Sequence, residues 1–431
     1  MHRYSPSTSA QTPLVLAALL ACVLSLLCAA CGTPPNPDCS IAPPTGYPTL
    51  TTAGGLVYLH SDRSSSLYAL RSSDGSLLWK YQAGSLLAVE HGIAYVQGTD
   101  DTFYALRASD GSMLWHYDMS KDVSGVIAVV DGLVYFNSSN NLTLYTLRAS
   151  DGKRLWQHKI DTDHYPSTVL AQGGVAYVAA EYSRVTALRE SDGAQLWQDD
   201  VSALPPAGLP LTVTLGNGIV YAASNQTMAL RASDGKVLWQ FAKAGPLVVG
   251  NGMVYVSSDQ LYALRASDGT QVWRWQFPSS EQYVLTLDSS VVYAGPDGGT
   301  LFVNRERIDT YKEHLYALNG STGAVLWNHS LGQSHTVLDV SGGVVYALSQ
   351  QALDAWQASS GSLLWHHPLQ QVGLLVDGGT VYAGTAGNAG DCFPLTNSKL
   401  TALRATDGSQ LWQFELGTVN SPTVKVLLPS V

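Results

Sequence analysis

Two groups of residues in this chain have types and spacings that could bind a metal ion. Asp161 and Asp163 are separated by one residue, like the first two ligands of a calcium-binding loop. Such a loop also needs a glycine at its sharp turn and a glutamate at its end, and Gln172 occupies that last place here. His366 and His367 are adjacent, with no other ligand at metal-binding spacing around them. We therefore predict no metal site.

The sequence also lacks the common motifs of catalysis. It contains no nucleophile elbow, no His-Glu-x-x-His zinc motif and no glycine-rich phosphate loop. Its formal net charge of −10 disfavours nucleic acid as a partner, because nucleic-acid-binding proteins favour a basic face. We predict that the protein is not an enzyme and has no catalytic residues.

One short phrase recurs along the chain and dominates its organisation. In its fullest form it reads Leu-Tyr-Ala-Leu-Arg-Ala-Ser-Asp-Gly-x-x-Leu-Trp, and its first copy spans residues 67–79. The nine copies end at Trp79, Trp115, Trp156, Trp197, Trp239, Trp273, Trp327, Trp365 and Trp412. A period near 40 residues is typical of propellers and solenoids. A feature that is repeated in every copy is structural, so we expect a unique functional site where the repeat is broken.

Each copy contains four apolar stretches of strand length. In the second copy they are residues 86–90, 93–98, 103–107 and 113–117. Alternating β-branched and aromatic residues favour strands, and Asn-Gly and Asp-Gly pairs between apolar runs favour tight hairpins. The pattern predicts an all-β fold, a single closed β-propeller of four-stranded antiparallel blades.

The number of complete copies predicts nine blades. Eight blades are the alternative, with one copy displaced or degenerate. Residues 421–428 read as an extra first strand that would complete the first blade beside the N-terminal strands and so close the ring. Each repeated tryptophan is expected to pack between neighbouring blades, where truncation to alanine typically costs about 3–5 kcal/mol.

The repeated phrase resembles the tryptophan-docking motif of pyrroloquinoline-quinone (PQQ) propellers, a family that includes the BamB-type outer-membrane assembly lipoproteins. The resemblance covers essentially residues 48–431. The family usually has an acidic or amide residue after Ala-Leu and a threonine before the glycine, as in residues 317–323 here. Seven other copies have arginine and aspartate in these places, for example Arg71 and Asp74. We expect these residues to form an exposed ion pair across the hairpin, worth only about 0–1 kcal/mol.

The resemblance implies a choice between catalysis and scaffolding. Catalytic members hold PQQ and a calcium ion with Glu, Asn and Asp residues, and often have two adjacent cysteines beside the quinone. This chain has no Cys-Cys pair and lacks the long insertions that build that pocket. We therefore predict a non-catalytic scaffold for protein–protein interaction, with a role in envelope or outer-membrane protein assembly and no cofactor. The alternatives are a ligand-binding or sensory propeller and, less favoured, a PQQ-dependent dehydrogenase with calcium.

The N-terminus reads as a targeting segment. Residues 13–30 are almost wholly apolar, and Cys31 follows small residues at their end, which resembles a bacterial lipobox. The match departs from the pattern at Cys28, where leucine is usual, and inside this segment a zinc or redox role for Cys28 and Cys31 is not expected. The resemblance implies lipid attachment at Cys31 and a monomeric body held at the extracytoplasmic face of a bacterial membrane, in the periplasm or at the cell surface. The predicted parts are a signal peptide (1–30), a lipidated, proline-rich spacer (31–47) and the propeller (48–431).

The repeat is broken at two insertions and two long connections. The insertions are residues 300–314 in the seventh copy and 385–399 in the ninth, both predicted between second and third strands; the connections are 157–167 and 198–210. All four are expected on one face of a propeller, and loops on a rigid scaffold often carry function. We predict that this face binds an envelope or membrane protein. Its candidate contact residues are Arg305, Glu306, Arg307, Asp309, Lys312, His164, Tyr165, Asp199 and Asp200.

Two tryptophans lie outside the repeated position. Trp275 follows the sixth docking tryptophan, and Trp356 replaces the usual leucine of the eighth copy. Either could line the central channel or a surface groove, but we expect both to pack against neighbouring blades.

The cysteines allow a first test. After processing, only Cys39 and Cys392 remain besides the anchor, and exported proteins meet an oxidising compartment. We predict a Cys39–Cys392 disulfide that ties the spacer to the last repeat. A thiol titration of the denatured, unreduced mature protein should find no free thiol in its body, and two titratable thiols would rule the bridge out.

Overall fold

The computed structural model describes residues 48–61, 66–82, 85–119, 125–138, 142–160, 166–180, 184–201, 211–276, 290–294, 300–307, 312–333, 337–348, 352–369, 373–385, 399–415 and 424–426. The chain divides into two compact units, and all of these residues belong to one of them, Gly46–Asn388 with Pro394–Val431. No helix within these ranges has the length and apolar character that crossing a membrane requires. Cys31, Cys39 and Cys392 lie outside the described residues, so the lipid anchor and the disulfide stay predictions.

The regular elements of the described chain are strands, which form nine sheets. Blades 1 to 3 contain β1 (Pro48–Ala53), β2 (Leu56–Ser61), β3 (Ser66–Arg71), β4 (Leu77–Gln82), β5 (Ser85–Glu90), β6 (Ile93–Gln97), β7 (Thr102–Arg107), β8 (Met113–Asp118), β9 (Gly125–Val130), β10 (Leu133–Ser138), β11 (Thr143–Arg148) and β12 (Arg154–Lys159). Blades 4 to 6 contain β13 (Pro166–Gln172), β14 (Val175–Ala180), β15 (Arg184–Arg189), β16 (Gln195–Asp200), β17 (Thr212–Gly216), β18 (Ile219–Ala223), β19 (Thr227–Arg231), β20 (Val237–Phe241), β21 (Leu247–Gly250), β22 (Met253–Ser257), β23 (Leu261–Arg265) and β24 (Gln271–Trp275). Blades 7 to 9 contain β25 (Ser290–Ala294), β26 (Thr300–Arg307), β27 (Lys312–Asn319), β28 (Val325–Gln333), β29 (Val337–Ser341), β30 (Val344–Leu348), β31 (Ala352–Gln357), β32 (Leu363–Pro368), β33 (Gly373–Asp377), β34 (Thr380–Thr385), β35 (Lys399–Arg404) and β36 (Gln410–Glu415).

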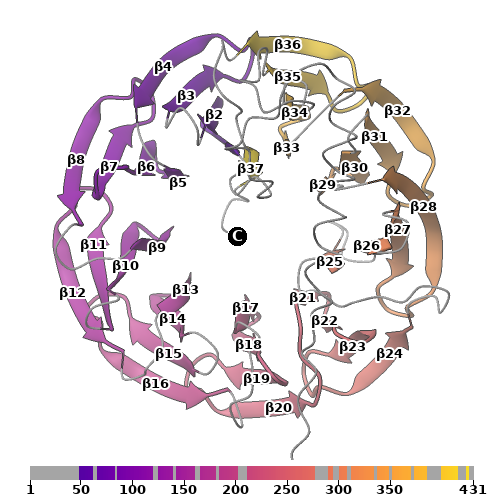
Figure 1. Ribbon diagram of the computed structural model, residues 1–431. Helices are drawn as coiled ribbons and strands as arrows, with labels where there is room; N and C mark the ends of the chain where they lie inside the picture. The colour runs from indigo at the N-terminus through magenta and orange to yellow at the C-terminus, as the bar shows by residue number, and fades with distance from the viewer. Residues whose placement is uncertain are drawn as a thin grey trace, which may run out of the picture. The chain divides into compact units, whose positions relative to one another are not determined.

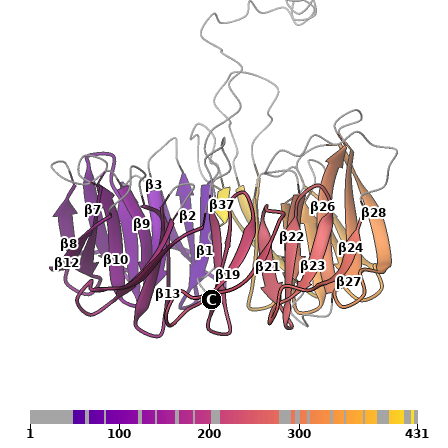
Figure 2. The same ribbon diagram turned by 90° about the horizontal axis from the view of Figure 1, so that it is seen from below.

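The nine sheets of this unit stand side by side around a central axis, with the first strand of each blade innermost and the fourth outermost (Figure 1). Seen edge-on, the strands run between two faces that carry the turns (Figure 2). The predicted all-β propeller with nine blades is confirmed, and the eight-blade alternative is wrong.

The C-terminal strand joins the first blade, beside its N-terminal strand. β37 (Val424–Val426) pairs with β1 in parallel, with Pro48 opposite Val424 and Leu50 opposite Val426. Blade 1 already has four strands of its own, so β37 is a fifth, innermost strand. The prediction of an extra first strand beside the N-terminal strands is confirmed for residues 424–426, although blade 1 has four strands without it.

The repeated tryptophans connect each blade to the next. In every blade the indole Nε1 donates a hydrogen bond to a backbone carbonyl in the turn between the third and fourth strands of the following blade, at 2.7–3.0 Å. Trp79, for example, donates to Ala108 at 2.8 Å. Trp412 of the last blade donates to Ser72 of the first at 2.8 Å, and this contact closes the ring.

The glycine in each turn between third and fourth strands makes room for the indole of the preceding blade. All nine of these glycines have a φ between +68° and +72°, a left-handed conformation that favours glycine. A Cβ atom at any of them would lie 2.5–2.8 Å from the tryptophan ring of the preceding blade, as at Gly269 against Trp239. The turn therefore requires glycine for its backbone and again for its close approach to the indole.

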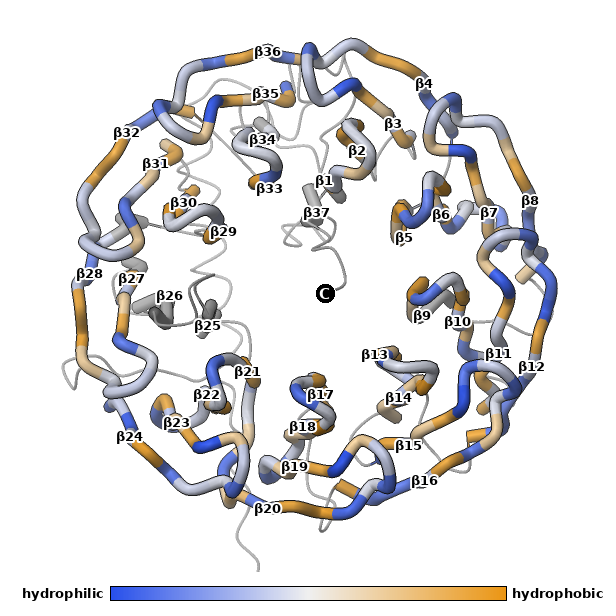
Figure 3. The backbone as a smooth tube through the Cα atoms, turned by 180° about the vertical axis from the view of Figure 1, so that it is seen from behind, coloured by the Kyte–Doolittle hydropathy of each residue, from blue (hydrophilic) through white to orange (hydrophobic). Residues whose placement is uncertain are grey.

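Nine apolar clusters fill the interfaces between adjacent blades, including the interface of blade 9 with blade 1. Trp275 contacts Tyr316 with ring centroids 4.9 Å apart, and Trp356 is buried against blade 7. Their predicted packing role is confirmed. Apolar segments also recur on the outermost strands (Figure 3), where aliphatic residues before the tryptophan, such as Leu78, stay exposed.

The predicted ion pairs in the turns between third and fourth strands are also present. Arginine Nη1 and aspartate Oδ2 lie 2.8–3.9 Å apart in seven blades. The side chains are about half exposed, so each pair contributes little to stability.

Two glycines of blade 6 distinguish the energetic cost of a left-handed backbone from the cost of a steric clash with the indole. Gly252 and Gly269 have φ values of +72° and +70°, but a Cβ at Gly252 meets nothing within 4 Å. Gly252→Ala should cost about 1–2 kcal/mol of the free energy of unfolding, the penalty for a left-handed non-glycine residue. Gly269→Ala should cost about 1–3 kcal/mol more, because Trp239 must move. Urea unfolding of both variants checks this, and equal losses would contradict the docking arrangement.

Candidate functional site

The charged segment of blade 7 is a hairpin and not an inserted loop. Arg305, Glu306 and Arg307 end strand β26, and Lys312 begins β27. The two strands stay paired beyond the usual hairpin length, with Arg305 opposite His314, Glu306 opposite Glu313 and Arg307 opposite Lys312. The predicted insertion at 300–314 is thus corrected, because 300–307 is itself the second strand of the blade. Asp309 lies outside the described residues.

The other predicted contact residues are divided between strands and undescribed segments. Asp199 and Asp200 lie at the end of strand β16 and not in a loop. Asp200 forms an ion pair with Arg184, with Oδ1 and Nε 2.6 Å apart. Partial burial raises the pKa of Asp199. His164 and Tyr165 lie outside the described residues. The predicted break at 385–399 does fall between second and third strands, since β34 ends at Thr385 and β35 begins at Lys399.

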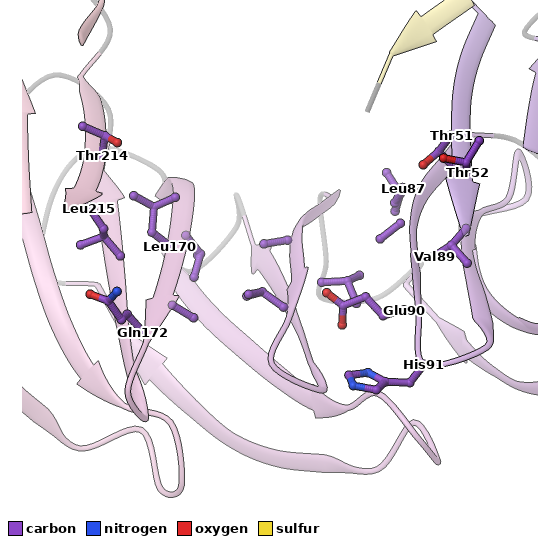
Figure 4. Close-up of a pocket in the computed structure, with 16 residues that line it drawn as sticks. Thr51, Thr52, Leu87, Val89, Glu90, His91, Leu170, Gln172, Thr214 and Leu215 are labelled. Carbon is purple, nitrogen blue, oxygen red and sulfur yellow. The ribbon is translucent and has the colours of Figure 1, made fainter. Parts of the chain in front are cut away.

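The structure contains a cavity that sequence reasoning missed. It has a volume of about 760 Å³ and is lined by the innermost strands of the first five blades, β1, β5, β9, β13 and β17 (Figure 4). Its wall is mixed: aliphatic residues alternate with polar ones such as Thr214 and Gln172, and Leu87, Val89 and Leu215 also pack against the apolar clusters between blades. Pockets of this size with a few polar groups are typical small-molecule sites.

Among the described residues that line this cavity, Glu90 is the one carboxylate. It is the last residue of β5, and its Oε2 atom is buried without a hydrogen-bond partner. Burial raises the pKa of Glu90, and the nearby Asp131 carboxylate raises it further, while His91 and the backbone N–H of Gly132 oppose this shift. A charged oxygen that lacks a partner away from water is costly, which is why burial disfavours the ionised form of Glu90.

A second partly buried carboxylate lies in the neighbouring blades. Glu190 stands where the other copies have alanine, serine or glycine, and its Oε1 accepts a hydrogen bond from Tyr135 at 3.0 Å. Burial raises the pKa of Glu190, and Asp131 adds to the shift. Glu190 could have been found from the sequence as a departure from the repeat, whereas the position of Glu90 varies from copy to copy.

The described residues offer no cluster of ligands for a metal. Within the ranges given above, no three His, Cys, Asp or Glu side chains are arranged to hold a metal ion. His366 instead contacts Asp354 of the adjacent strand, with Nδ1 and Oδ1 2.6 Å apart.

Comparison with known proteins places this propeller in a family. A family model described as "Outer membrane protein assembly factor BamB" matches residues 65–274, 183–306 and 274–426. The chain belongs to this BamB-type family of PQQ-like propellers. No curated protein matches it in sequence.

Solved structures share its fold at low sequence identity. BamB from Moraxella catarrhalis is 17% identical with a TM-score of 0.50, over 72% of this chain and 94% of that one. The computationally designed Ika8 protein is 12% identical with a TM-score of 0.50, over 74% and 95%. The quinohemoprotein alcohol dehydrogenase ADHIIG from Pseudomonas putida HK5 is 14% identical with a TM-score of 0.49, over 88% and 75%. At these identities the likeness shows the fold alone.

The raised pKa of Glu90 predicts a pH-dependent effect on stability. A carboxyl whose pKa is higher in the folded than in the unfolded state favours folding at low pH, and this contribution is lost as the pH rises through the folded-state pKa. Glu90→Gln should therefore raise the melting temperature at pH 7.5 and have a smaller effect at pH 4.

Asp377 supplies the matched control, because it ends β33 at the corresponding place in blade 9 and is exposed. Asp377→Asn should change the melting temperature little at either pH. If Glu90→Gln instead raises the melting temperature more at pH 4 than at pH 7.5, or lowers it at pH 7.5, the raised pKa of Glu90 is contradicted.

Proposed function

We propose that this protein is a non-catalytic scaffold, anchored by lipid at Cys31 to the extracytoplasmic face of a bacterial membrane. In this proposal it holds an envelope protein during outer-membrane protein assembly. The family description, which names an outer membrane protein assembly factor, supports this role. The nine-bladed ring provides a rigid platform on which breaks in the repeat can present a binding surface.

The β26–β27 hairpin is the observation that carries the proposal. Its register places Glu306 opposite Glu313 and Arg307 opposite Lys312. In a chain of which only 13% of the residues are charged, this hairpin gathers Arg305, Glu306, Arg307, Lys312 and Glu313 at one end of blade 7. Charges in an interface favour a partner of complementary charge, which is why we assign the partner to this end of blade 7.

The scaffold assignment is favoured over quinoprotein catalysis by the sequence. The chain has no adjacent cysteine pair and no long insertion of the kind that the catalytic relatives use. Reduction of a dye by the purified protein with added PQQ, calcium and an alcohol or aldose would contradict the scaffold assignment.

Charge reversal in the hairpin tests the binding surface. Arg305→Glu combined with Arg307→Glu should reduce the yield of the crosslinked partner in native membranes at least about tenfold, as expected when charges in an interface are opposed. The measurement is crosslinking followed by affinity purification of the lipidated protein and quantitative mass spectrometry.

Lys236→Glu is the matched control, because Lys236 is an exposed cation in the turn between β19 and β20, at the opposite ends of the strands. It should leave the partner yield unchanged. If deletion of residues 305–312 also leaves every crosslink in place, the hairpin does not bind the partner.

A further inference from the structure

The sequence contains the dipeptide Asn-Gly three times, and the fold places its copies in two different surroundings. Asn217-Gly218 joins β17 to β18 in blade 5, and Asn251-Gly252 joins β21 to β22 in blade 6. Asn319 instead ends β27 in blade 7, and Gly320 follows it in the turn to β28. The three copies share their chemistry, so any difference in their reactivity must come from the structure around them.

The turns of blades 5 and 6 are exposed and have space around them. Asn217 and Asn251 both have a φ of 52°, and the glycines after them have φ values of 73° and 72°. Two positive φ angles in a two-residue hairpin turn are typical of type I′, which favours Asn-Gly. All four residues are exposed to solvent, and a Cβ atom added at either glycine would meet no described atom within 4 Å. The backbone of these turns can therefore rotate without displacing a neighbour.

We propose that Asn217 and Asn251 are modification sites, at which the protein deamidates spontaneously. The backbone nitrogen of the following glycine, which has no side chain to obstruct it, attacks Cγ of the asparagine and closes a cyclic imide. The bond from Cγ to Nδ2 breaks, and Nδ2 leaves as ammonia with the proton of the glycine nitrogen. Water then opens the imide at either carbonyl carbon, which gives aspartate or isoaspartate. One water is consumed and one ammonia is released. Neither turn is part of the β26–β27 hairpin, so this modification goes beyond the scaffold function.

Asn319 is held in place by its neighbours and serves as an internal control. Its Oδ1 accepts hydrogen bonds from the backbone nitrogens of Ser321 and Thr322 at 3.1 and 3.0 Å, and from their hydroxyl groups at 2.8 and 3.0 Å. Gly320 is buried, and its carbonyl accepts the docking hydrogen bond of Trp273 at 2.8 Å. Attack by the Gly320 nitrogen would require the side chain of Asn319 to leave these bonds and the docked turn to rotate. We therefore expect Asn319 to deamidate slowly.

The two products of deamidation should affect the blade differently. Aspartate fits the turn, because Asp131-Gly132 forms the corresponding turn of blade 3 with φ values of 51° and 73°. Isoaspartate continues the chain through Cγ and so lengthens the backbone by one atom. In blade 5 only two residues separate Gly216 from its cross-strand partner Ile219, so the longer backbone no longer fits this register. Isoaspartate should therefore loosen the β17–β18 hairpin.

Incubation of the full-length protein at pH 7.5, followed by digestion and mass spectrometry, compares the three copies in one sample. The peptides with Asn217 and Asn251 should gain the mass difference between a hydroxyl and an amino group. They should do so at least about tenfold faster than the peptide with Asn319, because release of two of its hydrogen bonds raises the barrier by that factor. Methylation by an isoaspartyl carboxyl methyltransferase identifies the isoaspartate. In denatured protein all three peptides should convert at similar rates. Conversion of Asn319 as fast as the other two in the folded protein would overturn the proposal, and so would intact Asn217 and Asn251 when the denatured sample has converted.

The chain itself supplies a variant that folds and cannot deamidate at these turns. Four other blades have Gly-Gly at the corresponding place, for example Gly173-Gly174 in blade 4, so Asn217→Gly combined with Asn251→Gly should preserve the turns. After the same incubation the melting temperature of the unmodified protein should fall, whereas that of the variant should stay constant. An equal fall in both would overturn the effect assigned to isoaspartate. Crosslinking of the envelope partner by freshly prepared variant should match the unmodified protein, so this proposal and the scaffold function can fail independently.

Discussion

The hydrogen bond from each repeated indole to a carbonyl of the next blade is the interaction on which the ring depends. A single four-stranded sheet cannot cover its own apolar faces, so every blade needs two neighbours. The indole fixes the distance and angle between neighbours because it must reach both a carbonyl and a glycine that leaves room for its ring. The same geometry at Trp412 and Ser72 joins the last blade to the first, where β37 also pairs with β1.

The repeated and the unrepeated parts of the chain have different tasks. Tryptophan, turn glycine and the buried tyrosines and leucines are nearly constant from blade to blade and build the outer part of the ring. The innermost strands and the hairpin of blade 7 vary, and they supply the cavity and a concentration of charged residues. A platform held rigid by its constant residues can therefore carry groups that reduce its own stability, such as the buried oxygen of Glu90.

The architecture could be predicted from the sequence because the motif of one blade occurs nine times in it. Strand order, blade number, ion pairs in the turns and the packing of Trp275 and Trp356 all follow from local patterns. The hairpin of blade 7 was missed because its charged residues resemble a loop, although backbone pairing does not depend on side-chain polarity. The cavity was missed because its lining comes from five blades, and only the ring brings those strands together. Glu190 departed visibly from the repeat, but its partial burial depends on the neighbouring blade.

Hydrogen exchange of the indole N–H groups, followed by NMR, tests the closed ring most directly. Each of the nine docking indoles should exchange slowly, and the signal that disappears in Trp412→Phe should be protected as strongly as those of Trp79 and Trp239. This result would show that the last blade docks on the first as firmly as any other pair. Fast exchange at Trp412, with slow exchange at Trp79 and Trp239, would contradict a ring closed by tryptophan docking.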